Sequence, residues 1–142
     1  MDGSQKWTHK RVHLNLFNLI RRGVSVSKAA TNFSEKDLIV DKSIEKSFRQ
    51  ELESVTLLAT IFGYHITVSH FSEVTPECYD AISFRFNKNQ ELLFLDFYTE
   101  RDTFIVKQVS IWKGTHLISR TNNDANDEFV ETIISFRNML KW

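Results

Sequence analysis

Cysteine, proline and glycine are scarce in this sequence: 142 residues include one cysteine, one proline and four glycines. The single cysteine, Cys78, excludes an intramolecular disulfide and a zinc site built from cysteines. No stretch approaches the ~20 consecutive apolar residues that a transmembrane helix needs. The N-terminus also lacks the pattern of a secretory signal peptide. We therefore expect a cytoplasmic protein that does not enter a membrane.

Low-complexity tracts, internal repeats and linker-like stretches are absent as well. Residues 1–142 are therefore predicted to form a single domain. Hydrophobic residues make up 42% of the chain and include twelve phenylalanines, which is enough to fill a sizeable core. We expect a helical part over 1–63, a sheet over 64–121 and a C-terminal helix over 126–141.

Charge is balanced over the whole chain but not along it. Eighteen basic and eighteen acidic residues leave no global field that favours nucleic acid or an anionic membrane. Within residues 1–30, however, six cations face a single anion, so the rest of the chain has a net negative charge. Lys10, Arg11, Arg21 and Arg22 bracket one helical pattern. We predict that these four residues bind an anionic surface of a partner.

Two helices are predicted before residue 64. In 10–22 the apolar residues recur at helical spacing. A longer stripe over 43–62 comprises Ile44, Phe48, Leu52, Val55, Ala59 and Phe62. Gly63 follows as the left-handed residue that commonly ends a helix. Further apolar residues (Leu57, Leu58 and Ile61) widen the apolar face near this end, which is therefore expected to be deeply buried.

After Gly63 the apolar period changes to two, which is typical of strands. Strands are predicted over 64–70, 81–86, 91–98, 103–112 and 116–121, with hairpin turns at 87–90 and 113–115. The third is apolar on both faces, as expected for a central strand covered on both sides. Asn and Asp residues before 126, and acids just after it, indicate the start of the last helix. This order predicts an α+β fold with a five-stranded antiparallel meander, and the C-terminal helix packs on the sheet.

Residues 23–44 have the pattern of two short helices joined by a polar turn. The longer stretch 14–48, about 35 residues, resembles the N-terminal helix-turn-helix of LysR-type transcription regulators, through Leu16, Phe17, Gly23, Ala29, Ala30, Phe33 and Ile44. The resemblance implies a DNA-reading helix over 34–47. That stretch has four acids among its lysines and lacks the Arg or Gln that usually contact base edges and phosphates. Its turn also departs by one residue from the family spacing, and the remaining chain is too short for the family's effector domain.

Candidate catalytic and metal-binding groups fail on spacing. His9 and His13 stand at i, i+4, but position 10 is Lys where a zincin has Glu. Asp96 and Lys107 would suit a metal-dependent nuclease only with an acid at 105, which is Ile. Asp96 is expected to cap a turn or to pair with Arg85 or Lys107 instead. Catalytic, cofactor-binding and metal-binding residues are therefore not predicted.

Two functional hypotheses remain. The first is a small non-enzymatic binding protein that regulates, inhibits or neutralises a protein partner, of a bacterial or phage regulatory or immunity type. The alternative is a helix-turn-helix-like regulator that binds nucleic acid through the basic N-terminal region. Binding through several phosphates would show a steep salt dependence, which distinguishes the two.

Overall fold

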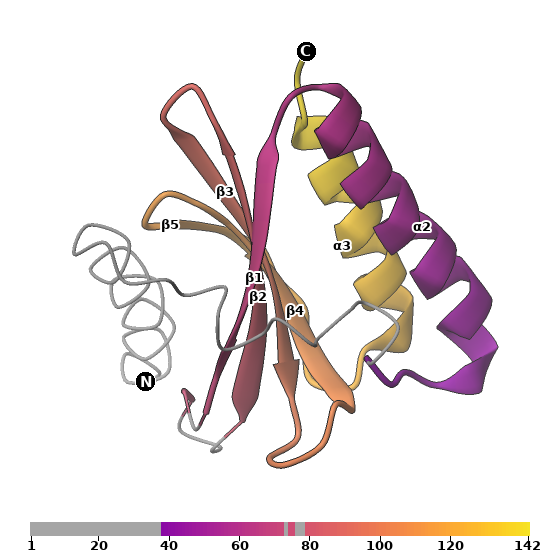
Figure 1. Cartoon of the computed structure of the whole chain (residues 1–142). Coiled ribbons are helices and arrows are strands. Elements are labelled where there is room, and N and C mark those ends of the chain that lie inside the picture. Colours follow the sequence, from indigo (N-terminus) through magenta and orange to yellow (C-terminus); the bar gives the residue numbers. More distant parts are fainter. Residues whose placement is uncertain (1–37, 73, 76–78) are drawn as a thin grey trace.

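The computed structural model describes residues 38–72, 74–75 and 79–142 (Figure 1). Within these ranges the chain forms a five-stranded sheet with helices before and after it. The elements are α2 (Lys42–Ile61), β1 (His65–Phe71), β2 (Asp80–Lys88), β3 (Glu91–Thr99), β4 (Val106–Lys113), β5 (His116–Arg120) and α3 (Asn126–Met139). The predicted α+β class is confirmed.

Helix α2 begins and ends as its sequence predicts, within one residue. The side chain of Asp41 caps its first turn by accepting hydrogen bonds from the Ser43 backbone N–H at 2.9 Å and from the Ser43 hydroxyl at 2.7 Å. At the other end Gly63 adopts a φ of 93°. The Gly63 and Tyr64 N–H groups donate to the carbonyls of Thr60 and Ala59, which is the Schellman pattern.

The sheet is the predicted meander, with the strands in the order β1-β2-β3-β4-β5 and each neighbouring pair antiparallel. The β2–β3 turn places Asn89 and Gln90 at φ values of 50° and 70°. Two consecutive left-handed residues match the twist of the flanking strands, which is why this turn suits a two-residue hairpin. Gly114, at φ 59°, occupies the corresponding turn between β4 and β5.

Both helices cover the same face of the sheet (Figure 1). The side chains of this face pack against the apolar stripes of the helices. The rings of Phe48 on α2 and Phe97 on β3 pack edge to face with their centroids 5.7 Å apart. The ring centroids of Phe136 on α3 and Phe86 on β2 are 4.7 Å apart. An ion pair between Arg137 and Glu51 links the two helices. Three residues of the predicted stripe of the last helix, Phe129, Ile133 and Phe136, are completely buried on α3. The fourth, Leu140, is also buried but lies in extended backbone just after the helix ends at Met139.

The start of α3 differs in one respect from the prediction. Its N-cap is Ala125, which has no side chain to cap the helix. The acids expected in the first turn, Asp127 and Glu128, are present there. The Glu128 carboxylate accepts a hydrogen bond from the Asn122 N–H at 3.1 Å, so it secures the loop before the helix.

Residues 38–41 contradict the second helix of the predicted helix-turn-helix. Ile39 forms a parallel bridge with Ile105, in which the Ile39 N–H donates to the Phe104 carbonyl at 2.7 Å. Leu38 is completely buried, and its carbonyl accepts a hydrogen bond from Arg49 at 2.7 Å. Because residues 38–41 are extended and α2 then continues for 20 residues, 34–47 is not one short reading helix.

The remaining N-terminal predictions lie outside the described residues. These are the helix over 10–22, the first part of the helix-turn-helix, the histidines His9 and His13, and the predicted partner-binding residues Lys10, Arg11, Arg21 and Arg22.

Candidate functional site

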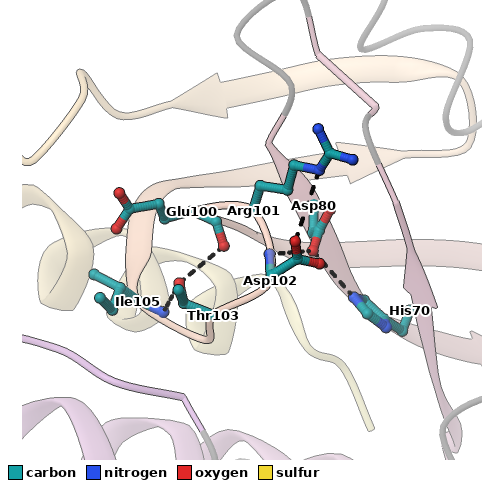
Figure 2. Close-up of polar contacts among 7 residues, drawn as sticks. All are labelled: His70, Asp80, Glu100, Arg101, Asp102, Thr103 and Ile105. Atoms are coloured by element: carbon teal, nitrogen blue, oxygen red, sulfur yellow. Dashed lines mark hydrogen bonds and ion pairs between the residues drawn. The ribbon is translucent and has the colours of Figure 1, made fainter.

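Three regions of the described structure gather buried polar groups or exposed apolar groups and are therefore candidates for a functional site. The first is the loop between β3 and β4 with the strand ends beside it (Figure 2). The second is the face of the sheet opposite the helices. The third is the outer surface of α2.

The β3–β4 loop is held in place through Asp80 at the start of β2. The Asp80 carboxylate, almost completely buried, accepts a hydrogen bond from the Asp102 N–H at 3.2 Å, and the imidazole Nε2 of His70 lies 3.7 Å from the same oxygen (Figure 2). Within the loop, the Thr103 hydroxyl donates to the Glu100 carbonyl at 2.8 Å. A His–Asp pair can orient a general base. Here the same carboxylate holds the backbone of Asp102, a left-handed residue at φ 61°, so the contact positions the loop.

The second region is a buried polar cluster on the sheet face away from the helices. The Ser83 hydroxyl donates to the Asp96 carboxylate at 2.6 Å, and the indole N–H of Trp112 donates to the Ser110 hydroxyl at 3.2 Å. Burial raises the pKa of Tyr98 well above its ordinary value, and the nearby Asp96 carboxylate adds to this rise. Tyr98 is therefore a neutral phenol near pH 7. The Ser83–Asp96 bond joins β2 to β3, whereas the Trp112–Ser110 bond lies within β4, so these buried polar groups satisfy one another within the sheet.

Arg85 and Lys107, the two partners predicted for Asp96, contact other residues. Arg85 donates instead to the Thr67 hydroxyl at 3.0 Å, and Lys107 pairs with Asp124 at 3.0 Å. The hydrogen bond to Asp124 raises the pKa of Lys107. Asp96 points to the face away from the helices, because its neighbours Leu95 and Phe97 belong to the core that the helices cover and side chains alternate along a strand. On that face it lies in register with Ser83 and Ser110.

The third region, the outer surface of α2, exposes large apolar side chains. Leu57 and Ile61 lie one turn apart and are 61% and 62% exposed. The apolar pattern predicts that both are buried, and this prediction is wrong. Leu57 follows Val55 and precedes Ala59 by two residues each, so at 3.6 residues per turn it lies opposite the buried stripe. That helical position is the sequence signal from which its exposure could have been inferred.

Two threonines extend this apolar surface. The Thr56 hydroxyl donates to the Glu53 carbonyl at 3.0 Å, and the Thr60 hydroxyl donates to the Thr56 carbonyl at 2.8 Å. Their hydrogen-bonding capacity is thus partly satisfied within the helix, so burying the side chains costs less. An open depression of about 590 Å³ runs along this face, lined by Gln50, Glu53, Ser54, Thr56, Leu57 and Thr60.

Aromatic side chains adjoin this surface at the end of α2. Trp142 stacks on Phe62 with ring centroids 5.1 Å apart and remains 89% exposed. The residue before it is anchored, since the Lys141 N–H donates to the Tyr64 hydroxyl at 3.1 Å and its carbonyl accepts from Lys88 at 2.8 Å. We call Leu57, Ile61 and the depression the outer α2 surface.

No three His, Cys, Asp or Glu side chains in the described part of the chain gather closely enough to hold a metal ion. None of the described helices is long and apolar enough to cross a membrane. Searches of protein-family models, curated proteins and solved structures found no match to this chain.

Proposed function

We propose that this protein acts by binding another protein, which it regulates, inhibits or neutralises without a catalytic step of its own. The observation that supports this function is the exposure of Leu57 and Ile61 on the outer α2 surface. Covering a leucine or isoleucine side chain contributes about 1.5–3 kcal/mol when burial is complete. Two such residues one turn apart, beside a depression, are the kind of apolar centre around which protein interfaces form.

The test is affinity capture from the native cell with two matched variants. Leu57→Asp/Ile61→Asp places charges on the outer α2 surface, and we expect it to lose the partner that the wild-type protein captures. Ile118→Asp is the control, because Ile118 is also an exposed isoleucine (51%) but lies on β5. Equal capture by the wild type and the double variant would show that the outer α2 surface is not the contact. A nuclease-treated sample tests whether nucleic acid mediates the capture.

The basic residues predicted from the sequence are a separate part of this proposal. Arg21→Glu/Arg22→Glu should weaken capture while leaving the thermal midpoint nearly unchanged, since surface charges contribute little to stability. Retained capture at both low and moderate salt would remove the basic residues from the contact. Loss of capture that depends on nucleic acid would instead favour the nucleic-acid-binding alternative.

A further inference from the structure

The outer α2 surface has an order of side chains that selects one kind of partner. From the N-terminal end, the residues that point away from the core are Lys46, Gln50, Glu53, Leu57 and Ile61. Each is exposed. Their spacings of three, four and seven residues keep them on one side of the helix. Along the axis they span about 22 Å at 1.5 Å per residue, or roughly four helical turns.

The two charged residues of this series are available to a partner. Three other charged residues of α2 are already paired within the protein: Glu45 with Arg49, and Glu51 with Arg137 of α3. Lys42, the first residue of α2, is exposed and lies one turn before Lys46. Among the described residues, Lys46 and Glu53 form no ion pair. The surface therefore presents a cation, an anion two turns later, and two aliphatic side chains over the next two turns.

We propose that the partner presents an amphipathic helix that lies antiparallel along α2. Its two apolar residues would cover Leu57 and Ile61, a basic residue one turn later would meet Glu53, and an acidic residue two turns further would meet Lys46. A helix suits the site because the exposed residues Glu53, Leu57 and Ile61 follow one another at intervals of four along α2, and helices pack through residues at such spacings. This inference rests on the proposed function and specifies the partner's chemistry.

Two synthetic peptides of identical composition and net charge test the inference. Both are 20-residue fluorescein-labelled helix formers with Leu at positions 3 and 7. The matched peptide has Lys at position 11 and Glu at position 18, whereas the exchanged peptide has Glu at 11 and Lys at 18. In fluorescence anisotropy titrations of the wild-type protein, we expect the matched peptide to bind about five- to tenfold more tightly, since two attractive pairs become repulsive on exchange.

The reciprocal variant makes the test specific to these two charges. Lys46→Glu/Glu53→Lys keeps the net charge of the protein and changes only exposed residues, so folding is expected to be intact. This variant should bind the exchanged peptide more tightly than the matched one. The control, Glu131→Lys, changes an exposed residue of α3 and should leave the preference of the wild type unchanged.

Three results would overturn the inference, and they are distinguishable from failure of the proposed function. The first is equal binding of both peptides to the wild type and the reciprocal variant. The second is absence of peptide binding while Leu57→Asp/Ile61→Asp still abolishes capture of the native partner; the outer α2 surface would then bind a partner that is not a helix. The third is sedimentation of the purified protein as a dimer that Leu57→Asp converts to monomer, because the occupant would then be a second copy.

Discussion

Leu52 and Leu57 lie five residues apart on the same helix and have opposite surroundings. Leu52 is completely buried in the core that α2 forms with the sheet and α3, whereas Leu57 is 61% exposed. Both contribute equally to the helix propensity of α2, so the difference between them is one of packing alone. The inner face of α2 stabilises the fold, and the outer face has apolar side chains that folding does not use. Substitutions on the two faces should therefore affect different measurements.

The largest effects are expected on the inner face. Phe48→Ala and Leu52→Ala each remove a completely buried side chain and leave a cavity, so each should lower the free energy of unfolding by about 2–5 kcal/mol. Urea unfolding followed by circular dichroism measures this change. Midpoints within a few tenths molar of the wild type would show that the inner face tolerates cavities and that the contrast with the outer face is false.

An intermediate effect on stability is expected at Gly63, just after the end of α2. Gly63 has a φ of 93°, and a Cβ there would meet nothing within 4 Å, so Gly63→Ala tests backbone strain alone. We expect a loss of about 1–2 kcal/mol in the free energy of unfolding. Gly63→Asn is the matched control and should lose less, because asparagine tolerates left-handed backbone better than alanine does. Equal losses for the two variants would argue against strain as the cause.

The features that the sequence predicted well are those with a local cause. The strands follow from a period of two in the apolar residues, and the end of α2 follows from a glycine at a left-handed position. The missed features have tertiary causes. The pattern predicts a helix over Leu38–Ile39–Val40, yet Ile39 pairs with Ile105, which is distant in the sequence. Short apolar runs fit a strand as well as a helix, and only the distant partner decides between them.

The candidate site was missed for a related reason. Their apolar character predicts that Leu57 and Ile61 are buried, although their helical position places them outside. The hydrogen-bond partner of Asp96 depended on the register of three strands, which brings Ser83 beside it and sets Arg85 against Thr67. Register over a whole sheet is a tertiary property, so residue types alone do not predict the partner of Asp96.

A smaller, pH-dependent effect is expected at the first turn of α2. Hydrogen bonds from the Ser43 hydroxyl and backbone N–H lower the pKa of Asp41 below its ordinary value of 3.8. A carboxyl whose pKa is lower in the folded state stabilises the fold above its unfolded pKa, and this stabilisation is lost as the pH falls through the folded pKa. Asp41→Asn keeps a capping side chain that does not titrate. The thermal midpoint of the wild type relative to this variant should therefore be constant above about pH 5 and decrease below about pH 3.8.

The Ser43→Ala variant is the control for that effect. It removes the hydroxyl that donates to Asp41 at 2.7 Å but keeps the backbone N–H donor. The acid-dependent decrease should be smaller in Ser43→Ala than in the wild type. A decrease of the same size in both proteins would show that the hydroxyl does not stabilise the charged carboxylate.

The smallest effect on stability is expected on the outer face, where Leu57→Ala and Ile61→Ala should each change the free energy of unfolding by no more than about 0.5 kcal/mol. Their side chains are already more than half exposed, so truncation removes little buried area and leaves no cavity. The comparison with Leu52→Ala is direct, since the same leucine-to-alanine change is made on the same helix. A loss above about 1 kcal/mol for Leu57→Ala would mean that the outer face packs against another part of the chain. If Leu57→Ala retains its stability but captures less of the partner, the inner face of α2 serves folding and the outer face serves binding.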